Sequence, residues 1–350
     1  MVHVSRPCCF EGPMQLLRAS FMPKGSSVSS SLCGRSFSGF REKHPDIQLR
    51  YAIQKKLGEG SCGVVFRAEV RDDHSICALK IVQTSQVPIA TIRYELEAHS
   101  AMSHPNIVAL WGSFEVDNYL CISMELCLGG CFCEFVTDTL MERVAGCHEL
   151  ETKHVFRQMA AAVEHMQSKG FAHRDLKFEN FVVEDSRLDM SDCTIKLIDF
   201  GFAKRFRIPA GVEGAGSSSL RLTTKCGSVG YTAPEVYLQQ SYDERCDVFS
   251  LGVMLFCLLG GRMPFPGETN RQIVQQVKTS IPHVVPSEWA QVPAAAEILT
   301  FGMLVKEPDN RLTLRCVIDS LWMKQDQESC SDAAEYGTQV QLYRPAVGGA

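Results

Sequence analysis

A dense polar run, His173–Asn180, stands between apolar segments in the middle of the chain. Within it, the spacing of Asp175 and Asn180 suits a loop in which one carboxylate receives a hydroxyl proton and one amide binds a metal ion. Lys177 stands between them and could neutralise the charge of a phosphate during transfer. The simpler alternative is a charged loop that is exposed to solvent. The polar motifs elsewhere in the chain, described next, argue against this alternative.

A second carboxylate, Asp199, follows a short predicted strand, Ile195–Ile198, and comes nineteen residues after Asn180. Phe200 and Gly201 complete the tripeptide, which by itself is common. Mg²⁺ is usually bound through one or two carboxylates together with substrate phosphates. A carboxylate at the end of a strand, followed by glycine, is therefore a candidate magnesium ligand.

A glycine-rich segment, Gly58–Gly63, lies between two predicted strands. Glycine lets the backbone approach a phosphate closely and point its amides at it. An ordinary glycine-rich hairpin and a dinucleotide-binding fingerprint are the alternatives. The fingerprint requires a helix after the glycines, whereas Val64–Val70 has the pattern of a strand.

Lys80 sits among apolar residues on the next predicted strand, seventeen residues after Gly63. A lysine that points to solvent from an edge strand is the alternative, but on a central strand the side chain must find an anion. Glu95, about one helix later, is well placed to hold this lysine in an ion pair. The sequence thus predicts a cation that is positioned near the glycines.

The elements that must position these residues change in character along the chain. The first third is rich in strands, and from Thr152 the apolar residues repeat at helical intervals. This order predicts an α+β fold of two lobes, joined near Cys127–Gly130. The expected N-terminal elements are strands at Tyr51–Lys56, Val64–Val70, Ile76–Val82, Val108–Phe114 and Tyr119–Met124, and a helix at Thr91–Ser103.

Composition excludes several classes of protein. Of the 350 residues, 45% are hydrophobic and 21% charged, and the net charge of −5 gives no reason to expect nucleic acid as a partner. The sixteen cysteines are scattered without a CxxC pair, which favours reduced thiols over a zinc site or a disulfide scaffold. The longest apolar stretch, Val248–Leu259, is too short to span a membrane.

Residues 1–48 indicate a flexible extension, and an organelle transit peptide is a less favoured alternative.

Taken in order, these motifs resemble the signature set of the eukaryotic protein kinase family. The set comprises the glycine-rich loop, the strand lysine, the helix glutamate, the His173–Asn180 loop, Asp199-Phe200-Gly201 and Ala233-Pro234-Glu235. The resemblance covers roughly Tyr51 to Met323. It implies a bilobal α+β kinase domain at 49–324, with an N-lobe at 49–127, a C-lobe at 128–324 and a short tail at 325–350.

The resemblance also implies a role for each site residue, with ATP and Mg²⁺ as cofactors. Lys80 would hold the α- and β-phosphates and Glu95 would hold Lys80. Asp199 and Asn180 would bind Mg²⁺, Asp175 would accept the proton of the substrate hydroxyl, and Lys177 would steady the γ-phosphate. The residues expected to contact the nucleotide, besides Lys80 and Glu95, are Leu57, Gly58, Gly60, Gly63, Val65, Ala78, Met124, Glu125, Cys127 and Val182.

Other motifs concern the branch of the family and the support of the site. Lys177 and Ser228 resemble the serine/threonine branch. Asp199–Phe206 is similar to cyclic-nucleotide-dependent kinases, whereas Ser320–Met323 and Asn118–Gly130 are similar to the calcium/calmodulin-dependent-like group, and both subgroups stay open. The family pattern further implies that Asp247 braces the catalytic loop and that Glu235 pairs with Arg311.

The segment from Asp199 to Glu235 is long for the family and contains a Gly- and Ser-rich insert, Arg207–Leu220. We expect Thr224 to be an activating phosphosite, modified by an upstream kinase and read by Arg174 and Lys204. A loop that is ordered without phosphate is the alternative, and Thr223 is the rival site.

Three residues depart from the family pattern. Cys62 replaces an aromatic residue at the tip of the glycine loop. His99 replaces an apolar residue that normally stacks toward Phe200, which puts the stability of the active helix position in doubt. Cys131 stands where relatives that prefer basic substrates often carry a glutamate. Glu179, a second acid of that pattern, is present, so a preference for basic peptides stays an open alternative.

The expected function is transfer of a phosphoryl group to protein serine or threonine hydroxyls. A nucleotide-binding pseudokinase scaffold and a small-molecule kinase are the alternatives. The presence of Lys80, Asp175, Asn180 and Asp199 disfavours the scaffold, and the peptide-docking stretch Gly227–Glu235 disfavours the small-molecule kinase. We expect a cytoplasmic or nuclear monomer with protein substrates, no nucleic-acid partner and no membrane span.

Overall fold

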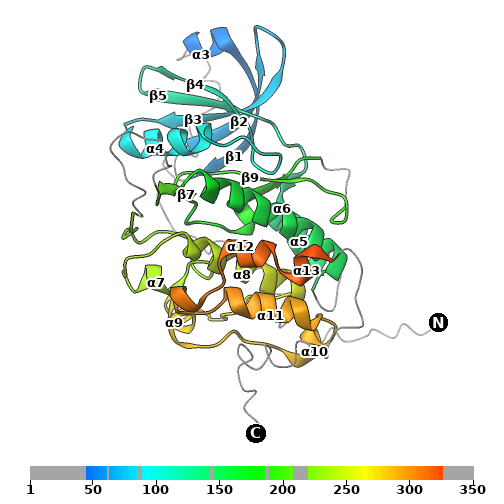
Figure 1. The fold of residues 1–350 in the computed structure, drawn as a ribbon. Coiled ribbons are helices and arrows are strands. Elements are labelled where there is room, and N and C mark those ends of the chain that lie inside the picture. Colours follow the sequence, from blue (N-terminus) through cyan, green and yellow to red (C-terminus); the bar gives the residue numbers. More distant parts are fainter. Residues whose placement is uncertain are drawn as a thin grey trace, which may run out of the picture.

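The computed structural model describes residues 45–60, 63–85, 89–141, 146–185, 189–207 and 220–325. The chain folds into a β-rich N-lobe above a helical C-lobe, which confirms the predicted bilobal α+β architecture (Figure 1). Residues 1–44, the glycine-loop tip with Cys62, most of the Gly- and Ser-rich insert at 208–219 and the tail from 326 on lie outside the described residues.

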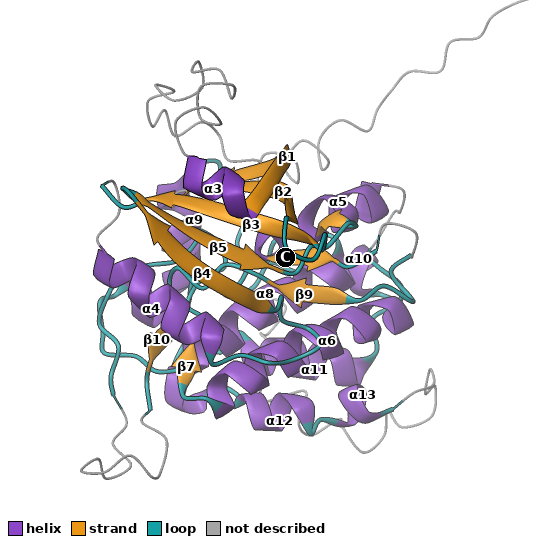
Figure 2. Ribbon diagram, turned by 90° about the horizontal axis from the view of Figure 1, so that it is seen from above, coloured by secondary structure: helices purple, strands orange, loops and turns teal. Residues whose placement is uncertain are grey.

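The N-lobe is an antiparallel sheet of five strands in the order β1-β2-β3-β5-β4, accompanied by one long helix. All five predicted strands are present, with ends shifted by a few residues. Seen from above, the sheet lies over the C-lobe helices, with α4 along one side (Figure 2). The elements are α3 (Pro45–Arg50), β1 (Tyr51–Gly60), β2 (Gly63–Val70), β3 (Ile76–Gln83), α4 (Ile89–Ser100), β4 (Leu110–Val116) and β5 (Tyr119–Met124).

The short helix α3 precedes the first strand of the N-lobe, and the boundary of the kinase domain at residue 49 stays a prediction. The sequence placed the end of the flexible extension at residue 48, but α3 already begins at Pro45. Ile47 is fully buried and joins the apolar cluster under β1, β2 and β3. Burial of one isoleucine favours order in this segment, and a stretch of only six residues is too short to show a helical period in the sequence.

The C-lobe is built around α8, a helix that is apolar on all sides and buried from Cys246 to Gly260. It ends at Gly261, whose φ of 74° lies in the left-handed region that favours glycine. The C-lobe elements are β6 (Gly130–Cys131), α5 (Phe132–Met141), α6 (Glu149–Ser168), β7 (Phe171–Ala172), the 3₁₀ turn η1 (Phe178–Asn180), β8 (Phe181–Val183), β9 (Ile195–Leu197), β10 (Lys204–Arg205), α7 (Pro234–Tyr237), α8 (Arg245–Gly260), α9 (Asn270–Thr279), α10 (Pro286–Trp289), α11 (Ala294–Met303), the 3₁₀ turn η2 (Pro308–Asn310), α12 (Leu314–Ile318) and α13 (Leu321–Lys324).

The small sheet β6-β8-β9 connects the hinge between the lobes with the segment that leads to Asp199. Gly130 and Cys131, just after the hinge, pair with Val183 and Val182 of β8. Strand β8 in turn pairs with β9, which leads to Asp199. Among the described residues, no helix is both long and apolar enough to cross a membrane.

Candidate active site

The Lys80–Glu95 ion pair links the N-lobe sheet to helix α4. Lys80 lies on the central strand β3, opposite Val65 of β2 and Ile122 of β5. Its Nζ donates a hydrogen bond to Oε1 of Glu95, and only a small part of either side chain is exposed. The predicted pair is thus formed, and it holds the lysine of β3 against helix α4.

The loop that carries Asp175 is fixed from below by the buried α8. The carboxylate of Asp247 accepts hydrogen bonds from the backbone N–H groups of His173, at 2.7 Å, and Arg174, at 2.8 Å. Arg174 has a φ of 70°, an uncommon value for a residue with a side chain. Burial raises the pKa of Asp247, while its electrostatic interaction with His173 and the hydrogen bonds from the two N–H groups lower it. The expected bracing role of Asp247 is confirmed.

Asp175 projects into the site with its two carboxylate oxygens in different situations. Oδ2 lies 3.0 Å from Nζ of Lys177, which also donates to Oγ of Ser228 at 2.7 Å. Oδ1 is buried and has no hydrogen-bond partner within the described part of the chain. Because an unsatisfied buried acceptor costs about 1–3 kcal/mol, this oxygen is suited to receive a hydrogen bond from a bound hydroxyl.

Hydrogen bonds connect Asn180 with the residue before Asp199 and with the loop that carries Asp175. The N–H of Ile198 donates to the carbonyl of Asn180 at 2.8 Å, and the Asn180 side chain donates to the carbonyl of Asp175, also at 2.8 Å. Asp199 has a φ of 64°, and its Oδ1 accepts a hydrogen bond from the N–H of Gly201. One carboxylate and one amide oxygen form a hard donor set that fits Mg²⁺ when phosphates and water supply the other ligands.

The expected adenine contacts come from both lobes. Val65 and Ala78 lie on the adjacent strands β2 and β3, and Ala78 pairs with Met124 at the end of β5. Val182 lies on β8, beyond the hinge. Leu57, Gly58 and Gly60 lie on β1 and Gly63 begins β2. Contact of these residues with a nucleotide stays a prediction.

The hinge is held by a cluster of charges that the sequence did not predict. Lys196 on β9 is buried and donates to Oε1 of Glu125, and it lies 3.1 Å from Glu184. The other oxygen of Glu125 accepts the N–H of Ala109. Burial by itself would lower the pKa of Lys196, but the two carboxylates outweigh it and raise this pKa above its ordinary value. The cluster fastens the hinge to β9, next to Cys127.

The segment around Thr224 is tied to the catalytic loop through Tyr242. The Thr224 side chain is exposed, and its carbonyl accepts a hydrogen bond from the Tyr242 hydroxyl at 2.7 Å. The same hydroxyl accepts a hydrogen bond from Arg174, whose Nε donates to the carbonyl of Phe202. The Lys204 side chain lies over the ring of Tyr94. The structure therefore places Arg174 against the Thr224 segment.

The catalytic loop itself carries a second, partly buried carboxylate, Glu179. Glu179 lies in the 3₁₀ turn η1, two residues after Lys177, and its buried Oε2 has no hydrogen-bond partner among the described residues. Burial raises the pKa of Glu179, an effect that its own N–H and the charge of Lys177 oppose and Asp175 supports.

Comparison with known proteins supplies the family. The sequence profile of the protein kinase domain matches residues 51–323, nearly the range that the motifs cover. The chain belongs to the protein kinase family.

Several relatives of this kinase are known by name. A probable myosin light chain kinase of Dictyostelium discoideum is 34% identical over 83% of this chain and 79% of its own length. Calcium/calmodulin-dependent protein kinase type 1B of Rattus norvegicus is 31% identical over 82% of this chain and 78% of its own length. Serine/threonine-protein kinase 33 of Bos taurus is 29% identical over 79% of this chain, which spans about half (56%) of that relative.

These relatives decide two questions that the motifs left open. The kinase is a serine/threonine kinase, and its relatives support the calcium/calmodulin-dependent-like group. Nothing in the comparisons favours the pseudokinase alternative. The family acts on proteins, so protein substrates follow from membership.

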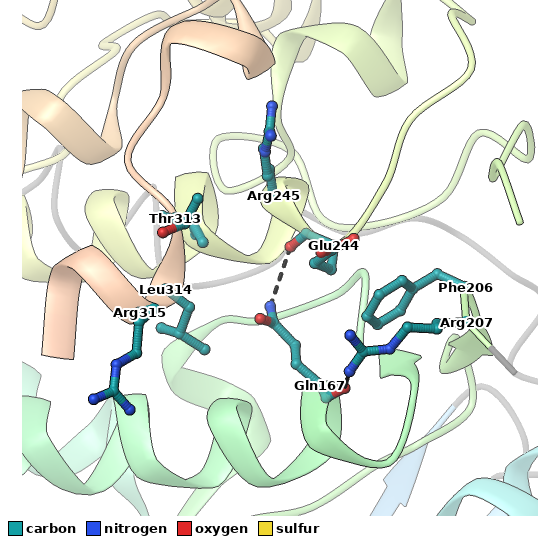
Figure 3. Close-up of a pocket in the computed structure, with 9 residues that line it drawn as sticks. Gln167, Phe206, Arg207, Glu244, Arg245, Thr313, Leu314 and Arg315 are labelled. Carbon is teal, nitrogen blue, oxygen red and sulfur yellow. Dashed lines mark hydrogen bonds between the residues drawn. The ribbon is translucent and has the colours of Figure 1, made fainter. Parts of the chain in front are cut away.

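A separate pocket of the kinase lies between the end of α6, the start of α8 and α12 (Figure 3). Three arginines line it, but their side chains point in different directions. Arg245 pairs with Asp309, and Arg315 pairs with Asp319. Since the cations do not converge, we assign no anion site there. The lining residues are Gln167, Phe206, Arg207, Glu244, Arg245, Val248, Thr313, Leu314 and Arg315.

Proposed function

We propose that this kinase uses ATP with Mg²⁺ as its phosphoryl donor and that the residues described above act in one transfer site. Lys80, held by Glu95, binds the α- and β-phosphates. Asp199 and Asn180 provide the protein ligands of Mg²⁺, which when bound neutralises charge on the phosphate oxygens. Alignment and charge neutralisation are the main contributions that this chemistry requires of the protein.

Asp175 and Lys177 would act at the reacting atoms. Asp175 orients the substrate hydroxyl and takes its proton, while the hydroxyl oxygen forms a bond to the γ-phosphorus. The bond from that phosphorus to the β,γ-bridging oxygen breaks, and ADP leaves with the electron pair. Lys177 steadies the γ-phosphoryl oxygens. The observation that carries this assignment is the buried Oδ1 of Asp175, which has no hydrogen-bond partner among the described residues.

We further propose a monomeric kinase of the cytoplasm or nucleus. The described cysteines, from Cys77 to Cys316, are all free thiols, which supports a reducing compartment.

We propose that phosphorylation of Thr224 by an upstream kinase increases activity. Its side chain is exposed, and its backbone is joined through Tyr242 to Arg174. A phosphate on Thr224 would form charge-assisted hydrogen bonds with Arg174 and would draw in the exposed Lys204. These contacts would hold the segment in the arrangement that peptide binding needs.

Replacing Thr224 by alanine is therefore expected to lower kcat/KM for a serine peptide by about tenfold, the effect of losing one or two charge-assisted hydrogen bonds. Wild type and variant are assayed after treatment with an extract that activates the wild type, and phosphate is mapped by mass spectrometry. Thr223→Ala, the rival neighbour, is the matched control and should keep its response. Equal activation of Thr224→Ala and wild type would refute the proposal.

A further inference from the structure

Two histidines meet where the N-lobe rests on helix α6 of the C-lobe. His104 lies in the loop between α4 and β4, and His165 lies in the last turn of α6. Their ring centroids are 5.3 Å apart, and the ring planes are inclined by 33°. Both residues are partly exposed, so protons from the solvent can reach them. The roles proposed for the transfer site do not involve this pair.

Each of the two rings accepts a hydrogen bond from a backbone N–H group. The N–H of Ser103 donates to Nε2 of His165 at 3.2 Å, and this bond crosses from one lobe to the other. The N–H of Asn106 donates to Nδ1 of His104 at 3.1 Å. An imidazole nitrogen accepts a hydrogen bond only while it carries no proton, so this arrangement requires both rings to be neutral. A protonated ring would point one N–H group at another.

The loop that carries these hydrogen bonds also supports strand β9. The side chain of Asn106 donates to the carbonyl of Ile195 at 3.0 Å and to Oε1 of Gln158 on α6 at 2.8 Å. The carbonyl of Asn106 accepts the N–H of Leu197 at 2.8 Å. Because β9 leads to Asp199, release of this loop from α6 would disturb a carboxylate of the transfer site.

We propose that His104 and His165 form an acid-sensitive latch between the lobes, which holds the loop after α4 on α6 while both rings are neutral and releases it when either ring is protonated. Release disturbs β9 and slows phosphoryl transfer, so the kinase loses activity in mildly acidic surroundings. The effect on the rate rests on the proposed transfer site, whereas the latch itself does not.

The electrostatic surroundings of the pair oppose its protonation. Burial lowers the pKa of both histidines; the charge of His165 lowers that of His104 further, and the charge of Lys169 lowers that of His165 further. A proton on one ring therefore disfavours a proton on the other. Further charged or titratable groups of α4 and α6 are engaged elsewhere: Glu97 with Arg205, His99 with the Val108 carbonyl, His154 with the Cys193 carbonyl and Glu164 with Arg315.

The lowered pKa values set the direction of the pH dependence. The latched arrangement binds fewer protons than the released one, in which the rings have their ordinary pKa of 6.5. The latch is therefore fully favoured above pH 6.5 and weakens as the pH falls through the pKa values of the latched state. Histidine is the side chain that ordinarily changes its charge between about pH 5 and 8, which suits a response to mild acid.

Hydrogen exchange of the wild type at pH 7.5 and 5.5 tests the latch itself. Protection factors, which correct for the pH dependence of intrinsic exchange, are compared for a peptide that covers residues 101–108 and for a peptide from β3. Between the two pH values, protection of the first peptide should fall about tenfold more than protection of the second. Equal changes in both peptides would overturn the proposal, whatever the mechanism of transfer.

A double variant, His104→Asn with His165→Gln, tests the effect on activity. Its amide oxygens can accept the same N–H groups but do not titrate, so it should keep the wild-type kcat at pH 7.5. At pH 5.5 its kcat should exceed that of the wild type by about threefold, because only the wild type releases the loop.

His74→Gln is the matched control for the double variant, since 79% of the His74 side chain is exposed. Its pH profile should follow that of the wild type. Superimposed pH profiles of the wild type and the double variant would also overturn the proposal. Because hydrogen exchange uses the wild type alone, that measurement decides the matter even if the double variant does not fold.

Discussion

Replacing Asp175 by asparagine is expected to reduce kcat by about 10³-fold, within the range that a positioned general base contributes. The change is nearly isosteric, so the loop that Asp247 braces should keep its shape. The amide cannot take the proton of the substrate hydroxyl, and it loses the charge that Lys177 faces at 3.0 Å. Because the nucleotide contacts are elsewhere, KM for ATP should change much less than kcat.

Steady-state transfer of phosphate from ATP to a serine peptide measures this effect. Asp72→Asn is the control. Asp72 is an exposed aspartate in a turn of the N-lobe, so this substitution makes the same chemical change away from the site. The control should retain wild-type kcat. A loss of less than about tenfold in Asp175→Asn would show that another group performs this step.

Replacing Arg311 by methionine is expected to destabilise the C-lobe by about 3–5 kcal/mol, the usual cost of removing one partner from a buried ion pair. Nη1 and Nη2 of Arg311 donate to the two carboxylate oxygens of Glu235 at 2.7 and 2.9 Å. The exposed fractions of the two side chains are only 0% and 2%, so the Glu235 carboxylate would remain buried with neither a cationic partner nor hydration. Methionine fills a similar volume but carries no charge that could neutralise the Glu235 carboxylate.

Urea denaturation followed by circular dichroism measures the change in the free energy of unfolding. Arg315→Met is the matched control, because Arg315 pairs with Asp319 while 74% of its side chain is exposed. Exposed pairs contribute about 0–1 kcal/mol, so the control should unfold near the wild-type midpoint. Equal midpoints for Arg311→Met and Arg315→Met would contradict the assigned role of the Glu235 pair.

The sequence predicted those parts of the fold and site that depend on local pattern. Strand-like apolar runs on either side of Gly58–Gly63 and around Lys80 predicted the strands, and the resemblance predicted which distant polar residues meet. The Lys80–Glu95 pair, the bracing by Asp247 and the Glu235–Arg311 pair are all present in the structure.

The features that the sequence did not predict are contacts between side chains far apart in the chain. Lys196 and Glu125 are 71 residues apart, and only the packing of β9 against the hinge makes them neighbours. The hydrogen bond from His99 to the Val108 carbonyl depends on the rotation of α4, which no periodicity specifies. The helix that begins at Pro45 is held by contacts with distant residues, among them the burial of Ile47 and the hydrogen bond from Arg71 to the carbonyl of Gln48. Each of these is decided by tertiary packing rather than by local preference.

Calorimetric titration with ATP, in the presence and absence of Mg²⁺, most directly tests whether Lys80, Asn180 and Asp199 converge on one metal-bound triphosphate. The wild type should bind ATP more tightly with Mg²⁺. Asp199→Asn should keep metal-free binding through Lys80 but lose the gain from Mg²⁺. A wild type that binds no ATP with Mg²⁺, or an Asp199→Asn variant with the full gain, would contradict the account.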